Sequence, residues 1–259
     1  MPNLDALLQF THALLDETDA IATELFRGEL TITAKHDRTL VTQADTGVET
    51  RLRERILAEF PTHGIVGEEF GTEPGDGETR WIIDPIDGTH NFVRGIPIWA
   101  TLVALERDGQ LVLGAASAPA LGTRWAATAG GGARIRTAND ERPMGVSRIA
   151  TMSEAQVISS SLRAMDGAGM GDGLHRAVNA SWRDRGFGDF WGYTLVAQGA
   201  AEAMVEVGPT IWDLAAPYAI VTEAGGRMTD LEGRPSWSGP TVLATNGILH
   251  EEMLSLLGG

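Results

Sequence analysis

The sequence contains no cysteine, which excludes disulfide bonds, thiolate metal ligands and a cysteine nucleophile. It also has no apolar run near the ~18 residues that a membrane-spanning helix requires. Residues 1–5 lack the basic start and the apolar stretch of a secretory signal. From these absences we expect a soluble cytoplasmic protein.

Basic residues are few, because 20 lysines and arginines stand against 35 aspartates and glutamates, for a formal net charge of -15. This balance argues against a nucleic-acid partner, since phosphate backbones attract basic surfaces. The acidic excess has two explanations, ordinary solubility or a cluster of acids that binds cations, and composition does not choose between them. The length of 259 residues suits one large domain or two fused lobes.

Hydrophobic spacing in the first half predicts two amphipathic helices and a sheet of mainly antiparallel strands. The helices are expected over 4–26, ended by Gly28, and around 48–56, closed by Pro61. The polar segment 31–41 is expected to be a loop or a short hairpin. Short apolar runs predict strands at 65–67, 81–83, 98–105, 111–116, 124–128 and 134–136.

The pattern changes near residues 140–155, after which strands and helices alternate, as in an α/β unit. Gly167–Gly173 is glycine-rich and is expected to be a loop, and Asn246 is expected to cap a final helix. We expect one fold over 1–259 with lobes of approximately 1–145 and 146–259. Strands are expected at 157–159, 203–207 and 242–244, and helices at 174–182, 193–201 and 214–224.

Two aspartates, Asp84 and Asp87, follow directly on a predicted buried strand. A turn at Gly88 can aim both carboxylates and the carbonyl of Ile86 at one point, and hard cations such as Mg²⁺ prefer these oxygen ligands. The amides of Gly88 and Thr89, at a predicted helix start, suit a phosphate oxygen. Taken alone, this spacing is more typical of an ordinary turn with a helix cap.

Three other acids change that balance. Glu68 follows a second short strand, and Asp45 and Asp213 each precede a predicted amphipathic helix. Each has an ordinary alternative role, which is solvent exposure for Glu68 and helix capping for Asp45 and Asp213. Asp213 also has large apolar neighbours, and a partly buried acid in such surroundings needs a partner, for which a metal ion is one candidate.

Several motifs together resemble the inositol monophosphatase-like family of metal-dependent phosphatases, and the resemblance covers nearly the whole chain. The resemblance implies an α/β (α+β) fold, a layered αβαβα sandwich of the inositol monophosphatase and fructose bisphosphatase type. It also implies a homodimer and two or three Mg²⁺ ions. The motifs, in family order, are Gly67-Glu68-Glu69, Asp84-Pro85-Ile86-Asp87-Gly88-Thr89, Asn91-Phe92, Trp212-Asp213 and Glu223-Ala224-Gly225-Gly226.

The same resemblance assigns roles to residues. Thr89 is implied as a contact for water and phosphate, Asp45 as its partner, and Lys35 as a loop residue that closes over the site. The implied mechanism is in-line attack on phosphorus by a water that Glu68 and Thr89 orient, without a side-chain nucleophile. The implied metal ligands are Glu68, Asp84, the Ile86 carbonyl, Asp87 and Asp213.

Two segments favour histidinol phosphate as the substrate, which would place the enzyme in histidine biosynthesis. The segment 91–100, with Arg94, and the segment 188–193, with Asp189, are similar to the histidinol-phosphatase branch of the family. Glu206 matches a family substrate contact. Asp189 and Glu206 can bind the cationic end of histidinol phosphate by charge-assisted hydrogen bonds, although Asp189 also suits a helix cap.

Two other functions remain open at this stage. The first is the same hydrolysis of a phosphoric monoester with inositol phosphates as substrates, which need only hydroxyl partners. The second is a non-catalytic metal-binding or regulatory relative, which would be expected to lack at least one ligand. All of the expected acids are present, so the sequence favours an enzyme.

Overall fold

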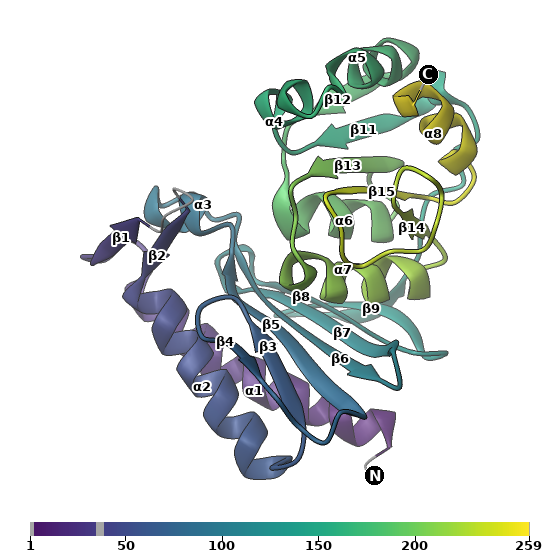
Figure 1. Cartoon of the computed structure of the whole chain (residues 1–259). Coiled ribbons are helices and arrows are strands. Elements are labelled where there is room, and N and C mark those ends of the chain that lie inside the picture. Colours follow the sequence, from purple (N-terminus) through teal and green to yellow (C-terminus); the bar gives the residue numbers. More distant parts are fainter. Residues whose placement is uncertain (1–2, 35–38, 259) are drawn as a thin grey trace.

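The computed structural model describes residues 3–34 and 39–258, whose helices and strands stack in five layers (Figure 1). The helices are α1 Leu4–Leu25, α2 Gln43–Glu59, α3 Thr89–Val93, α4 Leu162–Gly167, α5 Gly171–Ala180, α6 Asp189–Ala197, α7 Ile211–Glu223 and α8 His250–Gly258. The strands are β1 Ile32–Ala34, β2 Leu40–Thr42, β3 Gly64–Gly67, β4 Gly71–Glu73, β5 Thr79–Asp87, β6 Ala100–Arg107, β7 Gln110–Ala118, β8 Thr123–Thr128, β9 Gly132–Thr137, β10 Glu141–Met144, β11 Gln156–Ser159, β12 Arg183–Arg185, β13 Ala203–Val207, β14 Arg227–Thr229 and β15 Thr241–Thr245.

The first two layers are the helices α1 and α2 and the larger sheet, whose strand order is β10-β9-β8-β7-β6-β5-β3-β4. Both helices bury one apolar stripe, for example Leu14 of α1 and Leu52 of α2, against Trp81 and its neighbours in β5. Most strand pairs in this sheet are antiparallel, but β3 and β5 run parallel. The carboxyl ends of β3 and β5 therefore meet at the same edge of the sheet.

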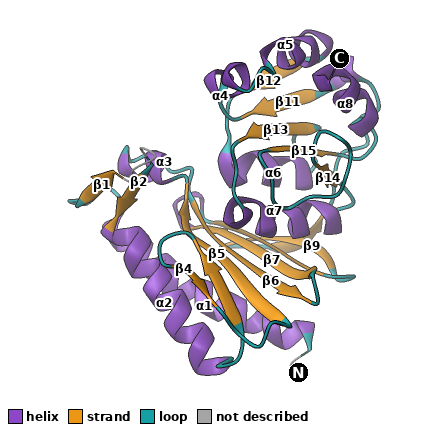
Figure 2. Cartoon of the chain, in the orientation of Figure 1, coloured by secondary structure: helices purple, strands orange, loops and turns teal. Residues whose placement is uncertain are grey.

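The third layer, α6 and α7, lies between the two sheets (Figure 2). Both helices are apolar on nearly every side, which is the pattern expected of a helix covered on both faces. Beyond them lies the smaller sheet, with the order β12-β11-β13-β15-β14, and its other face is covered by α4, α5 and α8. The predicted αβαβα sandwich is confirmed.

Several local predictions need correction. Gly167–Gly173 is not one loop, because α4 ends at Gly167 and α5 begins at Gly171. The helix expected from residue 193 begins four residues earlier, at Asp189, and the final helix begins at His250. Asn246 caps a turn before that helix by accepting hydrogen bonds from the amides of Ile248 and Leu249. These errors share one cause, since glycines and side-chain caps mark a break in the chain without fixing on which side the helix lies.

The segment 31–41 contains the two strands of a hairpin, β1 and β2, in which Thr33 faces Val41. Among the residues that the structure describes, no helix is long and apolar enough to cross a membrane.

Candidate active site

The carboxyl end of β5 presents Asp84 and Asp87 at an irregularity in its pairing with β6. Between these two aspartates, the Pro85 carbonyl accepts a hydrogen bond from the Thr101 hydroxyl at 2.8 Å, which fixes the bulge. Gly88, which follows Asp87, has a φ of 84° and is the N-cap residue of α3. A Cβ atom at Gly88 would lie 3.0 Å from the Ile98 carbonyl, so the turn requires a glycine both for its angle and for its space.

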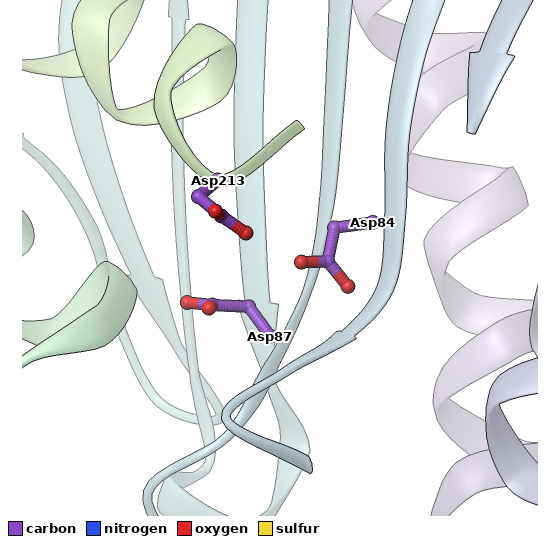
Figure 3. Close-up of side chains that lie close together, drawn as sticks. All are labelled: Asp84, Asp87 and Asp213. Atoms are coloured by element: carbon purple, nitrogen blue, oxygen red, sulfur yellow. The ribbon is translucent and has the colours of Figure 1, made fainter. Parts of the chain in front are cut away.

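Asp213 reaches the same point from the first turn of α7, on the opposite side of the sheet edge. Oxygen atoms of Asp84, Asp87 and Asp213 all lie within 4.8 Å of one another. Figure 3 shows the three carboxylates gathered together, with those of Asp84 and Asp213 pointing into the space between them. Glu68, which follows β3, lines the same cavity of about 170 Å³.

The electrostatics of this cluster are unfavourable without a cation. Burial raises the pKa of Asp84 well above its ordinary value, and the charges of Glu68 and Asp87 raise it further. Burial and then the charge of Asp189 raise the pKa of Asp87 well above its ordinary value too. The Oδ1 atom of Asp84 is buried and accepts no hydrogen bond from the part of the chain that the structure describes. Buried carboxylates with unused oxygens are what a divalent cation needs, so this donor set fits Mg²⁺.

Thr89 and Asp45 form a second group beside the carboxylates. The Thr89 hydroxyl lies 3.1 Å from Oδ1 of Asp45 and 3.0 Å from the Ile86 carbonyl oxygen. Oδ2 of Asp45 meanwhile accepts hydrogen bonds from the amide and the hydroxyl of Thr42, so Asp45 also caps α2. The same carboxylate thus serves the helix and the site.

A second cavity of about 480 Å³ adjoins the first, and Asn91 and Asp189 line both. A ligand with its phosphate at the carboxylates can therefore extend past these two residues into the larger space. The other residues that line the larger cavity are Ile96, Ile98, Ser160, Ser161, Gly186, Phe187, Gly188, Glu206 and Val207.

Asp189 connects the two cavities. Its φ of 58° lies in the left-handed region, and its carboxylate accepts a hydrogen bond from the Asn91 amide at 3.3 Å. The next residue, Phe190, donates its backbone N–H to Asp87 at 2.6 Å. The start of α6 is thus tied to the acidic cluster as well as to the larger cavity.

Glu206 lines the larger cavity and is almost fully buried. The hydroxyl of Tyr193 donates to its carboxylate at 2.6 Å. Burial raises the pKa of Glu206 to about 7, although the bond from Tyr193 acts in the opposite direction. A fixed carboxylate in this position suits a cationic or hydroxyl-bearing partner.

The sequence-based site predictions fall into four groups. Asp45 lines neither cavity, but it is buried and its Oδ1 lies 3.1 Å from the Thr89 hydroxyl. Arg94 is exposed and lines neither of these two cavities of the described chain. Lys35 lies outside the described residues. The predicted residues that line one or both cavities are Glu68, Asp84, Ile86, Asp87, Gly88, Thr89, Asp189, Glu206 and Asp213.

Sequence reasoning assigned no role to Asn91, Phe187 or Tyr193. Asn91 is part of the Asn91-Phe92 motif, and it lies two residues after Thr89. This short distance in the sequence could have indicated that Asn91 lies near the site. Tyr193 is one of two tyrosines in the chain, but nothing in the sequence places it beside Glu206.

Residues 3–257 match the model of the inositol monophosphatase family. The chain is 41% identical to a histidinol-phosphatase from Streptomyces coelicolor over 99% of this chain and 98% of that protein. It is 42% identical to a histidinol-phosphatase from Mycobacterium tuberculosis, over 96% and 97%, and 32% identical to an inositol-1-monophosphatase from Mesorhizobium japonicum, over 87% and 85%.

Solved structures agree with these matches. The extragenic suppressor protein suhB from Bartonella henselae superposes with a TM-score of 0.90 at 27% identity, covering 97% of this chain and 98% of that one. An IMPase from Thermotoga maritima superposes with a TM-score of 0.87 at 28% identity, covering 98% and 97%. With its acidic cluster at the shared edge of β3 and β5, the chain belongs to the inositol monophosphatase family.

Proposed function

We propose that the protein is an Mg²⁺-dependent phosphatase that hydrolyses L-histidinol phosphate to L-histidinol and phosphate. The observation that carries this proposal is the pair of joined cavities, one lined by Asp84, Asp87 and Asp213 and the other by Asp189 and Glu206. The former suits a metal-held phosphate, and the latter suits a cationic end group. The identity to proteins named histidinol-phosphatase, 41–42% over nearly the whole chain, supports this choice.

In this proposal Glu68, Asp84, Asp87, Asp213 and the Ile86 carbonyl hold two or three Mg²⁺ ions. When bound, the ions would neutralise the phosphate oxygens, acidify the attacking water and stabilise the leaving alkoxide. The mutual repulsion of the buried carboxylates supports this assignment, because bound cations would neutralise their charges.

The remaining residues of the smaller cavity would orient the water. If the Thr89 hydroxyl donates its proton to Asp45, the Thr89 oxygen is left as an acceptor for a proton of the water. Glu68 would accept the second proton, which turns a lone pair of the water toward phosphorus. The amides of Gly88 and Thr89, which line this cavity at the start of α3, would donate to a phosphate oxygen in this arrangement.

In the larger cavity, Asp189 and Glu206 would receive the ammonium and imidazole groups of the substrate. Two carboxylates on one small ligand favour a cation over a neutral polyol, because an ammonium or imidazolium adds ion–ion attraction to the hydrogen bond that a hydroxyl would also make. Ile96 and Phe187 supply apolar surface for the ring. We further propose that the enzyme serves histidine biosynthesis in the cytoplasm and acts as a homodimer.

The test is phosphate release by the purified protein with Mg²⁺, comparing histidinol phosphate with inositol 1-phosphate. A kcat/KM ratio of about 100 in favour of histidinol phosphate, about 2.7 kcal/mol of discrimination, is expected. The opposite preference would keep the metal site and make inositol phosphates the substrate class, as the 32% identity to an inositol-1-monophosphatase allows.

A variant sharpens the test of the cationic subsite. Asp189→Asn should raise KM for histidinol phosphate by ~10-fold or more and leave KM for glycerol 2-phosphate nearly unchanged, since a charge-assisted bond contributes about 1.5–3 kcal/mol. Asp184→Asn is the matched control, because Asp184 is an exposed acid on the edge strand β12. Equal KM changes for both substrates would make Asp189 a structural residue.

A further inference from the structure

One face of α2 carries three charged residues at four-residue intervals, Asp45, Glu49 and Arg53. Residues at this spacing lie one above another on a helix. Asp45 faces Thr89 at the active site, and Glu49 follows one turn later. Although Glu49 is an acid, it is fully buried, next to the apolar positions Val48 and Leu52.

The carboxylate of Glu49 accepts three hydrogen bonds and makes one further ion-pair contact. Its Oε2 accepts the backbone N–H of Glu69 at 2.7 Å, and its Oε1 accepts that of Phe70 at 3.1 Å. The guanidinium of Arg53 donates to Oε1 through Nε at 2.9 Å and approaches the same atom with Nη2 at 2.8 Å. Arg53 also donates to the Gly71 carbonyl. The Glu49–Arg53 pair therefore makes hydrogen bonds to the amides of Glu69 and Phe70, in the turn after β3, and to the carbonyl of Gly71, where β4 begins.

Glu68 lies inside this clamped turn, directly before Glu69. On its other side, a Cβ atom added to Gly67 would lie 2.2 Å from Oε1 of Glu49. The end of β3 thus approaches the Glu49 carboxylate as closely as a glycine permits. The backbone on both sides of Glu68 is fixed by contacts to α2.

We propose that Glu49, supported by Arg53, is a positioning residue that holds Glu68 at the metal site. Because Asp45 lies on the same helix face, α2 sets the separation between Glu68 and Thr89, the two groups that orient the water. This inference rests on the proposed function in one respect, the role of Glu68 as a metal ligand. In this proposal the buried ion pair Glu49–Arg53 positions a metal ligand without contacting the metal or the substrate itself.

The test measures Mg²⁺ binding by calorimetry and thermal denaturation without any substrate, so that an error in the substrate assignment does not affect it. Glu49→Gln should weaken Mg²⁺ binding ~10–100-fold, the usual cost of losing a residue that orients a ligand. The matched control is Glu54→Gln, on the same helix but exposed and paired with Arg51 at 3.5 Å, which should bind Mg²⁺ as the unchanged protein does.

A double-mutant cycle separates positioning from general stability. In a Glu68→Gln background, Glu49→Gln should add little further loss of Mg²⁺ affinity, because residues that act through one another are not additive. If Glu49→Gln fails to fold, Arg53→Gln, which keeps the Glu49 carboxylate, is expected to give a smaller loss of the same kind.

Two results would overturn the proposal. One is a lower melting temperature for Glu49→Gln and Arg53→Gln with unchanged Mg²⁺ affinity, and the other is full additivity with Glu68→Gln. If the unchanged protein binds no Mg²⁺, the proposed function fails and this role fails with it. If Mg²⁺ binds but histidinol phosphate is not hydrolysed, only the substrate assignment fails.

Discussion

Helices α2 and α7 begin in the same way but meet different neighbours. Each starts with a threonine followed three residues later by an aspartate whose Oδ2 accepts the threonine's amide, at 2.7 Å from Thr42 to Asp45 and 2.6 Å from Thr210 to Asp213. Both are capping boxes. The Asp45 carboxylate then meets a hydroxyl, that of Thr89, whereas the Asp213 carboxylate meets two more carboxylates.

This comparison shows that a capping role and a site role do not exclude each other. The sequence presented capping as the ordinary alternative for both aspartates, yet one oxygen suffices for the cap. The cap also fixes the side chain, so the second oxygen is held in place without further support. The two helices differ in the charge around that second oxygen, and substitutions at Asp45 and Asp213 test the difference.

The largest effect is expected at α7. Asp213→Asn should abolish Mg²⁺-dependent phosphate release while the metal-free protein melts at the same or a higher temperature, because the amide oxygen can still cap and one negative charge leaves a crowded cluster. Phosphate release and thermal denaturation in EDTA measure both effects. Asp172→Asn, in the first turn of α5, is the control, and measurable turnover by Asp213→Asn would remove Asp213 from the metal site.

At α2 the corresponding change should be milder. Asp45→Asn leaves the cap oxygen but puts an NH2 donor in place of the oxygen that accepts the Thr89 hydrogen bond, so kcat should fall ~10–100-fold, as for other residues that orient a catalytic group. Mg²⁺ affinity should change little, in contrast to Asp213→Asn. Steady-state kinetics over a Mg²⁺ titration checks this, and a loss of Mg²⁺ affinity as large as that of Asp213→Asn would make the two helices equivalent.

The pH dependence of stability should separate the charged cluster from the rest of the molecule. Asp84 and Asp87 have raised pKa values in the fold, and that of Glu206 is raised from 4.5 to about 7. Such acids bind protons more tightly when folded, so their stabilising contribution is complete below the unfolded pKa and is lost as the pH rises through the folded pKa.

For Glu206 this stabilising contribution is lost as the pH rises from about 4.5 to about 7. The pH profile of the melting temperature in EDTA should therefore become flatter in Asp87→Asn and Glu206→Gln than in the unchanged protein. Stabilisation by Mg²⁺ should be greater at pH 8 than at pH 5. Equal stabilisation at the two pH values would show that the cluster does not hold the ion as ionised carboxylates.

The smallest effects are expected from the caps alone. Thr42→Ala and Thr210→Ala each remove a hydroxyl that donates to the aspartate, at 2.6 and 2.9 Å, and should each lower the unfolding free energy by about 1 kcal/mol. Only Thr210→Ala should also raise the Mg²⁺ requirement, since Asp213 belongs to the carboxylate cluster that is proposed to hold the metal. Urea denaturation and Mg²⁺ titration measure the two effects, and identical Mg²⁺ curves would contradict the distinction.

The parts of the site that sequence reasoning brought together are those written contiguously or beside a clear strand end. Asp84 and Asp87 were expected on one turn, and that turn is at the end of β5. Glu68 could be placed with them because it directly follows β3, as Asp84 and Asp87 lie at the end of β5. The apolar neighbours of Asp213 already made a metal ion one candidate partner, and the family resemblance then assigned site roles to both Asp213 and Asp45.

Contacts between distant segments could not be predicted in this way. The hydrogen bond from the Phe190 amide to Asp87 joins residues that are 103 positions apart in the chain. Neither residue type indicates this contact in the sequence. The strand β12 was hidden because Arg183–Arg185 lies on a sheet edge without an apolar face. Glu49 gave a faint signal, an acid among buried helix positions, but its partners are backbone amides, which any sequence possesses.

The left-handed backbone at Asp189 has a consequence for engineering. An aspartate there costs roughly 1 kcal/mol relative to a glycine, which adopts this φ freely. A search for heat-resistant variants would therefore tend to select glycine at position 189, and it would discard the carboxylate that joins the two cavities. If Asp189 binds the substrate as proposed, thermal tolerance and choice of substrate oppose each other at this single residue, and selection for one must be accompanied by a screen for the other.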